Sequence, residues 1–284
     1  MRKLKDKAAT ILFWGIALTF ILLAVGILAF ILQRGWSALS WEFLTEKPRN
    51  SMTAGGILTP IVGTVELVVL SMAFALPIGV ATGLFFAEYA KPGPFVSALR
   101  TAIRCLAGVP SVVFGLFGLE LFVILCHFGP SLLSASLTLA CLSLPLLVTS
   151  SEQAFRAVPQ DERLASYALG AGKWHTIWHV VFPSSVPSII TGAILALGRV
   201  AGETAPIIFT GAAFFVPHLT ASLFDQVMAL PYHVMVLATA GTDISGTRHI
   251  QYGTVVVLLV LVMSLCLTGI LARNRLSRKR RRGA

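Results

Sequence analysis

The sequence predicts an all-α fold, a polytopic bundle of six transmembrane helices. Of its 284 residues, 56% are hydrophobic and only 12% are charged, and the mean hydropathy is +0.84. Soluble domains carry about 25% charged residues, so this composition indicates a membrane protein. Six apolar segments are long enough to cross a hydrocarbon core, which requires roughly 20 residues of helix. They are 11–32, 59–86, 105–127, 131–150, 185–215 and 253–271.

The first unit, residues 1–57, is predicted to contain a cytoplasmic N-terminus, an anchor helix and a periplasmic loop. A basic stretch followed by an apolar run also begins a secretory signal peptide. The apolar run 11–32 is longer than the apolar region of such a peptide, and LAFILQRGW contains no A-x-A cleavage site. We therefore expect an uncleaved helix.

The second unit, residues 58–272, is the predicted transmembrane core. Pro77, Pro145 and Pro206 interrupt three of its apolar segments. Proline is tolerated in spanning helices because neighbouring groups satisfy the carbonyls that it leaves free, so each segment is counted as one span. The four cysteines have irregular spacing and no C-x-x-C pair, and we expect inert thiols in the core. They are Cys105, Cys126, Cys141 and Cys266.

Basic residues give the predicted orientation. If the loops alternate between two sides, 17 lysines and arginines gather on the side that holds both termini and 4 on the other. The positive-inside rule then makes both termini cytoplasmic. The last unit, residues 273–284, is a basic tail that anionic lipid would attract. Nucleic-acid binding is the weaker interpretation of this tail, because no aromatic or fold motif accompanies it.

The long cytoplasmic loop, 152–183, is predicted to fold into two short helices. The first runs over 160–169, with Asp161 and Glu162 in its first turn and Gly170 and Gly172 as its C-terminal stop. The second starts at Lys173 and has an apolar stripe at helical spacing, formed by Trp174, Ile177, Trp178 and Val181. This stripe fits either a groove of another protein or the membrane interface.

The stretch GRVAGETAPI places Arg199 and Glu203 beside an apolar run. A charge at a helix centre costs about 2.5 to 3.5 kcal/mol on insertion scales, so something must offset it. Four residues apart on a helix, the two side chains would share a face and pair. The pair has two interpretations. In the first, the Arg199 guanidinium binds an oxyanion during transport and Glu203 accepts the proton of that anion. In the second, the two residues form an internal ion pair that fixes helix packing.

The remaining polar groups are two carboxylates in apolar segments, the histidines and the charges of the outer loop. Glu66 and Glu120 lie within apolar segments, and we expect them to face a polar interface. No other metal-ligating residue stands at ligand spacing from the histidines, and no metal site is predicted. The outer loop 216–252 is expected to contain a short helix between Pro231 and Gly241, and to expose charges that either meet a binding protein or are simply solvated. These charges are Asp225, Asp243 and Arg248.

The loop 152–183 also resembles the cytoplasmic loop of ABC importer permeases, whose pattern is E-A-A, three residues, Gly, nine residues, Ile-x-Leu-Pro. Here Leu164, Ala165 and Ser166 stand in the E-A-A positions, so the leading glutamate is absent. Gly170 and Pro183 occupy the glycine and proline positions. The resemblance implies the permease fold of type I ABC importers and an ATPase-coupling role for Ala165, Ser166, Gly170, Gly172, Lys173 and Pro183.

Three further stretches resemble the permeases of phosphate-specific ABC importers: AGVPSVVFGLFGL, RAVPQDERLASYALGAGKW and GRVAGETAPI. The short N-terminus and the segment EFLTEKPRNSMTAGGILTPIVGT resemble the A-type subunit in particular. The resemblance implies phosphate import through the bacterial inner membrane. It also implies three partners, namely a PstC-like second permease, a PstB-like ATPase dimer and a periplasmic PstS-like phosphate-binding protein. No G-x-x-x-x-G-K-[ST] motif occurs, so no cofactor is expected in this chain and ATP would be hydrolysed on a partner.

Two other function classes fit the sequence less well. A secondary anion transporter would show a repeat of its spanning segments, and none is visible. A membrane scaffold gives no reason to hold Arg199 in apolar surroundings. A permease for another oxyanion remains an alternative to a phosphate permease, and the chain itself is expected not to be an enzyme.

Overall fold

The computed structural model describes residues 2–240 and 246–283. Its regular elements there are helices, a small antiparallel hairpin of β1 (Pro48–Arg49) and β2 (Ala54–Gly55), and an isolated bridge between Ala212 and Val227 in the loop that follows α10. The longer helices are α1 (Arg2–Gly35), α3 (Leu58–Leu84), α4 (Pro94–Ala107), α6 (Leu132–Arg156), α9 (Phe182–Gly202), α11 (Leu230–Thr239) and α12 (Arg248–Gly283). Short helices are α2 (Trp41–Thr45), α5 (Ser111–Gly118), α7 (Gln160–Ala168), α8 (Lys173–Thr176) and α10 (Ala205–Thr210). Turns of 3-10 helix are η1 (Trp36–Ala38) and η2 (Asn50–Met52), and π-helical turns are η3 (Phe85–Tyr89), η4 (Leu119–Leu125) and η5 (Ile177–Val181).

The described part of the chain contains five helices that are long and apolar enough to cross a membrane. A sixth crossing results when the bent pair of α4 and α5 with η4 is counted as one span. The predicted all-α polytopic bundle is confirmed. The five straight spans are Thr10–Ala38, Leu58–Tyr89, Leu132–Arg156, Lys173–Gly202 and Arg248–Ser277.

The predicted third span, 105–127, is not a single helix. The chain bends by 103° between Ala107, the last residue of α4, and Ser111, the first residue of α5. Pro110 lacks the N–H that would continue the helix, and its ring pushes Val109 away from helical backbone angles. α5 and η4 hold 8 and 7 residues, which reach only about 22 Å, less than the roughly 30 Å hydrocarbon core.

The predicted fifth span, 185–215, also has different ends. It begins earlier, because α8 runs through the π-helical turn η5 into α9 as one continuous segment from Lys173 to Gly202. The expected second helix of the cytoplasmic loop is therefore the first part of this span. The segment stops at Gly202, since Pro206 has no N–H to donate to the Gly202 carbonyl.

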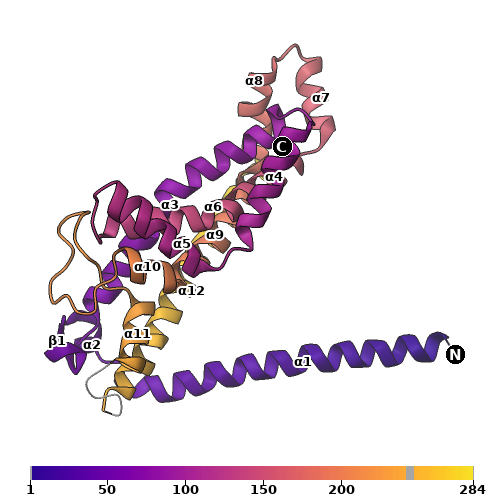
Figure 1. The fold of residues 1–284 in the computed structure, drawn as a ribbon. Coiled ribbons are helices and arrows are strands. Elements are labelled where there is room, and N and C mark those ends of the chain that lie inside the picture. The colour runs from indigo at the N-terminus through magenta and orange to yellow at the C-terminus, as the bar shows by residue number, and fades with distance from the viewer. Residues whose placement is uncertain (1, 241–245, 284) are drawn as a thin grey trace.

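α6 is the central helix of the bundle in Figure 1, and 67% of its spanning window is buried. α3, α9, α5, α10 and α4 pack around it. Glycines in α3 let it approach α6 closely: a Cβ added to Gly79 would lie 2.6 Å from the Cβ of Leu147, and one added to Gly83 would lie 2.6 Å from the Cβ of Ser151. Small residues at this spacing let two membrane helices pack closely.

α1 extends away from the bundle (Figure 1), and none of its spanning window is buried within this chain. It touches the rest of the chain near its C-terminal end, where a Cβ on Gly35 would meet the backbone of Tyr252. The short helix expected in the outer loop is present as α11. Arg248 is exposed and Asp225 is half-buried, whereas Asp243 lies outside the described residues.

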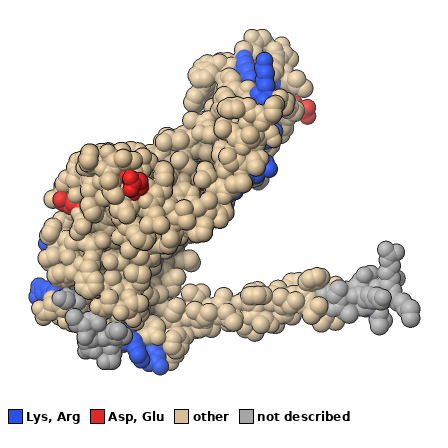
Figure 2. Space-filling view, in the orientation of Figure 1, with Lys and Arg blue, Asp and Glu red and all other residues tan. Residues whose placement is uncertain are grey.

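Two of the four cysteines are not in the core as expected, whereas Cys141 packs against the core cluster that contains Leu139 and Leu142. Cys105 and Cys126 are exposed, and Cys141 and Cys266 are half-buried. A membrane helix presents apolar side chains to lipid as well as to its neighbours, so an apolar segment alone does not place a thiol inside the bundle. Figure 2 shows lysines and arginines grouped at the end of the bundle that carries α7 and α8, while the middle of the visible face lacks them.

Candidate translocation and coupling site

The helix break after α9 is the first candidate feature. Glu203 follows the last helical residue, Gly202, with an extended backbone (φ −75°, ψ 131°), and α10 begins two residues later at Ala205. Backbone without helical hydrogen bonds is tolerated at membrane depth only where protein or a water-filled cavity covers it. The break is therefore expected to face protein or a water-filled cavity and not lipid.

Arg199 and Glu203 form the pair that their spacing predicted. The Arg199 Nε and the Glu203 Oε1 are 3.4 Å apart, with 37% of the arginine side chain and 17% of the glutamate side chain exposed. Glu203 is not on the helix as expected, because it lies one residue beyond the end of α9. Arg199 stands in the last turn, where the negative end of the helix dipole favours a cation. More than a third of its side chain is open to a neighbouring group.

The loop between α7 and α8 is the second candidate feature, and its glycine turn is confirmed. Gly170 follows the end of α7 with φ +82°. Its N–H donates to the Tyr167 carbonyl (2.9 Å), and the Ala171 N–H donates to the Ser166 carbonyl (3.2 Å). These two bonds are those of a Schellman motif, which commonly ends a helix with glycine in the left-handed region. Gly172 has an ordinary φ of −75°.

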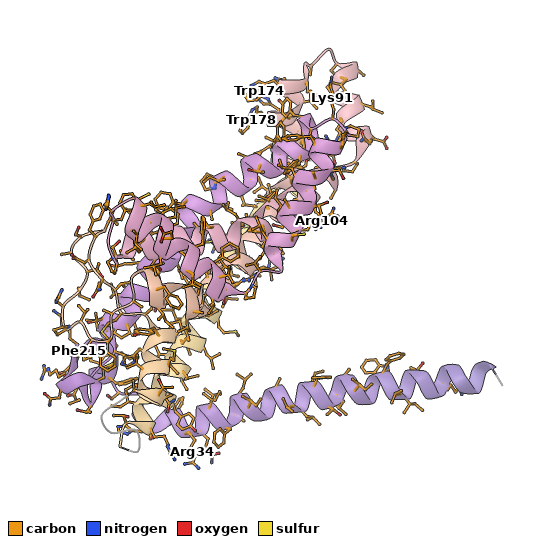
Figure 3. The ribbon with its side chains drawn as sticks, viewed as in Figure 1. Arg34, Lys91, Arg104, Trp174, Trp178 and Phe215 are labelled. Atoms are coloured by element: carbon orange, nitrogen blue, oxygen red, sulfur yellow. The ribbon has the colours of Figure 1, made fainter. Side chains whose placement is uncertain are left out.

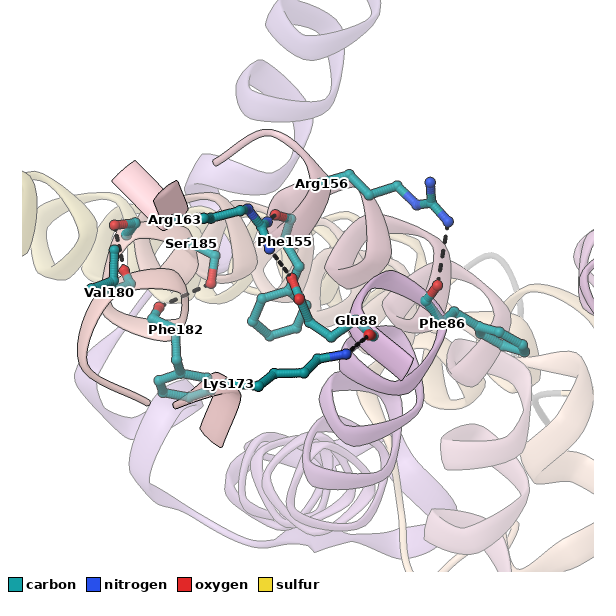
Figure 4. Close-up of polar contacts among 10 residues, drawn as sticks. Phe86, Glu88, Phe155, Arg156, Arg163, Lys173, Val180, Phe182 and Ser185 are labelled. Atoms are coloured by element: carbon teal, nitrogen blue, oxygen red, sulfur yellow. Dashed lines mark hydrogen bonds and ion pairs between the residues drawn. The ribbon is translucent and has the colours of Figure 1, made fainter. Parts of the chain in front are cut away.

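The loop is fixed to the bundle through the C-terminal end of the second span (Figure 4). The Arg163 guanidinium pairs with the Glu88 carboxylate, and its Nη2 donates to the Phe155 carbonyl at 2.7 Å. The Lys173 Nζ donates to the Glu88 backbone carbonyl and lies 4.5 Å from the centre of the Tyr89 ring. Only 12% of the Arg163 and 7% of the Glu88 side chain are exposed. This buried pair holds α7 against η3.

Two further hydrogen bonds connect α7 with the span that follows it. The hydroxyls of Ser166 and Thr176 are 2.9 Å apart, and the Ser184 hydroxyl donates to the Glu162 carboxylate at 3.0 Å. Of the coupling residues expected from the sequence, Ser166 and Lys173 therefore make contacts within the chain. The others are exposed, namely Ala165, Gly170, Gly172 and Pro183.

A groove of about 720 Å³ lies between α7 and α8, with Ala165, Leu169 and Val180 among its lining residues. Leu169 is 89% exposed, and a large apolar side chain so open at a groove is typical of a protein contact. Trp174 and Trp178 project from the α8 side of the loop (Figure 3), and their rings are 5.5 Å apart.

Of the remaining polar residues, Glu66 and Glu120 lie apart from these two features, whereas two histidines belong to the loop and one of them, His175, lines its groove. Glu66 is half-buried beside the outer loop, and its Oε2 is buried without a hydrogen-bond partner in the described part of the chain. Glu120 is exposed. The rings of His175 and His179 stack at 4.0 Å on the loop. The described residues contain no group of three His, Cys, Asp or Glu side chains that could hold a metal.

Sequence reasoning missed a polar network beside η3. The Phe86 carbonyl accepts from Arg100 (2.9 Å) and from Arg156 (3.3 Å), and both arginines pair with Glu152, at 3.0 and 2.9 Å. The Glu152–Arg156 spacing of four was visible in the sequence. Arg100 was not predictable, because it comes from α4, whose position depends on the bend at Pro110.

Comparisons with known proteins agree with this architecture. Residues 79–282 match the family of binding-protein-dependent transport system inner membrane components. The chain is 41% identical to the probable ABC transporter permease protein YqgI of Bacillus subtilis, over 74% of this chain and 71% of the relative. It is 33% identical to the phosphate transport system permease protein PstA of Mycobacterium leprae, over 94% of this chain and 88% of the relative.

Solved structures share the fold. A bacterial ABC transporter involved in the import of alginate superimposes with a TM-score of 0.65, 15% identity and coverage of 98% of this chain and 99% of that one. An inward-facing MetNI methionine ABC transporter gives a TM-score of 0.57 and 16% identity, over 78% of this chain and 94% of the other. At these identities the likeness is one of fold alone.

Proposed function

The chain belongs to the family of binding-protein-dependent transport system inner membrane components, and from this premise we propose that it is the A-type permease of an importer for inorganic phosphate. As a family member it is a multi-pass inner membrane permease subunit of an ABC importer and not itself an enzyme. Phosphate as the substrate is supported by PstA relatives such as that of Mycobacterium leprae, 33% identical over 94% of this chain.

The observation that carries the substrate proposal is the Arg199–Glu203 pair at the broken end of α9. A guanidinium presents a planar fork that fits two oxygens of a phosphate. Monohydrogen phosphate still has a proton to donate, which the Glu203 carboxylate would accept, whereas sulfate has none. In this proposal Arg199 attracts the anion at the break and Glu203 favours the protonated one.

The proposed coupling surface is the loop between α7 and α9. Ala165, Gly170 and the open Leu169 present the groove that a separate ATPase subunit would fill. Ser166 and Lys173 position the loop through their contacts with Thr176 and with the Glu88 carbonyl. Gly172 and Pro183 stand at the start of α8 and in the first turn of α9. ATP would bind to that partner and not to this chain.

The proposed assembly contains a second, PstC-like permease, two PstB-like ATPase subunits and a periplasmic PstS-like phosphate-binding protein. The apolar helix α1, which this chain leaves uncovered, offers the second permease a long surface within the lipid membrane. The charge count supports cytoplasmic termini and a cytoplasmic α7–α8 loop. Residues 1–57, 58–272 and 273–284 are proposed as anchor region, transport core and basic tail, and no nucleic-acid partner is proposed.

Reconstituted uptake tests the substrate proposal. The four subunit types are placed in vesicles, and ATP-dependent uptake of radiolabelled phosphate is measured against sulfate. The variants are Arg199→Ala, Arg199→Lys and the double variant Arg199→Leu with Glu203→Leu. Both interpretations of the pair expect Arg199→Ala to lose transport, because removal of one partner leaves an unpaired charge at a cost of about 3 to 5 kcal/mol in a buried site, less at this partly exposed one.

The double variant separates the two interpretations. If Arg199 meets phosphate, the variant should assemble and its ATPase should respond to loaded binding protein, while phosphate uptake stays abolished. Arg199→Lys should keep part of the activity, since an ammonium retains the charge and loses the fork. Substantial uptake by the Leu/Leu variant would refute substrate contact and leave a packing role. Preferential uptake of sulfate by the parent complex would show that the importer carries another oxyanion and not phosphate.

A further inference from the structure

A second basic site lies at the end of the bundle that carries the coupling loop. A cavity of about 320 Å³ opens between α4 and α6 next to η3, a size at the lower end of the range of about 300 to 1,000 Å³ for small-ligand pockets. It is separate from the break in α9: Val200, beside Arg199, packs in one cluster with Leu139 and Leu142, whereas the cavity begins further along α6 at Val148.

Three arginines and one glutamate line this cavity: Arg100, Arg104, Arg156 and Glu152. Only Arg100 and Arg156 share the carboxylate, both through its Oε1. Arg104 is exposed on α4 (Figure 3), and its guanidinium has no hydrogen bond or ion pair with any residue in the described ranges. Three cations therefore face a single anion, and the cavity keeps an excess of positive charge.

Donors that no protein group uses also point to a ligand. The Nε of Arg100 is buried and has no hydrogen-bond partner among the described residues. Its Nη2 already donates to the Phe86 carbonyl and forms an ion pair with Glu152, which fixes the guanidinium at 24% side-chain exposure. A buried donor without a hydrogen-bond partner is destabilising, and an anion bound in the cavity would supply an acceptor for it.

We propose that this cavity binds a phosphate-bearing anion, carried either by a phospholipid headgroup or by free phosphate. Guanidinium groups bind phosphate oxygens through paired, charge-assisted hydrogen bonds. Basic pockets between membrane helices near the surface are typical headgroup sites. α4 presents its apolar side chains Phe95, Leu99 and Leu106 openly beside these arginines, as a helix at the membrane interface does. The site does not depend on which ion the importer carries.

The test variant is Arg104→Gln, because Arg104 makes no hydrogen bond or ion pair with the described residues whose loss would disturb folding. Arg49→Gln is the matched control, since Arg49 is an exposed arginine of strand β1, outside both the cavity and the basic tail. In the first measurement, the nucleotide-free complex in phosphatidylcholine nanodiscs is titrated with radiolabelled inorganic phosphate. In the second, native mass spectrometry counts the phosphatidylglycerol molecules that remain with the complex after purification.

A loss of phosphate affinity of at least tenfold in Arg104→Gln, with Arg49→Gln unchanged, would support free phosphate as the ligand. Unchanged phosphate binding combined with fewer retained phosphatidylglycerol molecules in Arg104→Gln alone would support a headgroup. The proposal is overturned if both variants behave like the parent in both measurements. It is also overturned if only the Arg199→Leu/Glu203→Leu variant loses phosphate and lipid retention is unaffected, since phosphate then binds at the break in α9.

Discussion

Arg163→Gln should release the α7–α8 loop from the bundle without unfolding the bundle itself. Arg163 and Glu88 are 12% and 7% exposed, so the variant leaves a carboxylate buried without its cation, at a cost of about 3 to 5 kcal/mol. The same change removes the 2.7 Å bond to the Phe155 carbonyl. Each 1.4 kcal/mol corresponds to a factor of ten, and the open form of the loop should therefore become roughly 100-fold more populated or more.

Hydrogen exchange measures this opening. Amides of α7 (Gln160–Ala168) should exchange at least about 100-fold faster in Arg163→Gln, because a local opening reaction sets their protection. The double variant Glu88→Gln with Arg163→Gln should recover most of the protection, since neither charge then remains. Arg49→Gln is the control: the Arg49–Glu46 pair at 3.7 Å has exposures of 68% and 32%, and such surface pairs contribute only about 0 to 1 kcal/mol.

One result would refute the reasoning. If α7 in Arg163→Gln exchanges within about threefold of the parent rate, the Glu88 pair does not hold the loop, and other contacts position it. Those contacts are the hydroxyl pair of Ser166 with Thr176 and the bond from Ser184 to Glu162. A double variant as unprotected as the single one would likewise show that the hydrogen bond to the Phe155 carbonyl, and not the ion pair, is what matters.

Three more predictions concern the glycine turn, the orientation and a buried histidine. Gly170→Val should lower transport per ATP while membrane insertion is kept, because φ +82° strains a branched residue by about 1 to 2 kcal/mol or more; Gly172→Ala, at φ −75°, is the control, and equal behaviour of the two would contradict the turn argument. An impermeant thiol reagent should label a cysteine at Ser222 in cells without an outer barrier and should not label one at Ala165. The opposite labelling pattern would show that the predicted orientation in the membrane is wrong. Burial lowers the pKa of His233 to about 4, below its ordinary value of about 6.5, so stability is complete above pH 6.5 and falls as pH decreases toward 4. From pH 7 to 5, α11 should lose about 2 kcal/mol of protection against exchange, and a loss of the same size in His233→Gln would exclude the histidine as its cause.

The sequence predicted what depends on local chemistry. Asp161, Glu162 and Gly170 predicted α7 to within one residue of its observed end, because a first turn and a glycine stop are set by groups within a few residues of each other. The helix of the outer loop was predicted for the same reason, with Pro231 near its start. The spacing of Arg199 and Glu203 predicted their pairing, since four residues bring two side chains together on a helix and also just past its end.

What the sequence did not predict depends on tertiary position. Apolar content shows that a segment is in the membrane, but it does not show whether Pro110 is accommodated within a straight helix or bends the chain by 103°. The Glu88–Arg163 pair joins residues 75 positions apart, and the Arg100–Glu152 pair joins two helices whose contact follows from that bend. The exposure of Cys105 and Cys126 depends on which helix face meets lipid, and this too is a property of the assembled bundle.

The two candidate features are connected by a single helical segment. Lys173, which contacts the Glu88 carbonyl at the loop, begins the segment that ends at Gly202, and Arg199 stands in its last turn. Thirty residues at a rise of 1.5 Å per residue span about 45 Å, which exceeds the hydrocarbon core of about 30 Å. In the proposed importer, a partner that moves the α7–α8 loop therefore moves one end of a helix whose other end holds the arginine. The π-helical turn η5 (Ile177–Val181) interrupts the regular hydrogen bonds of this segment close to the loop, and bulges of this kind are where helices bend. After η5 the helix contains Pro187 but no further π-helical turn before the break at Glu203, and proline is a second point where a helix bends. A displacement applied beyond Pro187 therefore reaches Arg199 through one continuous helix and requires no separate relay of side chains.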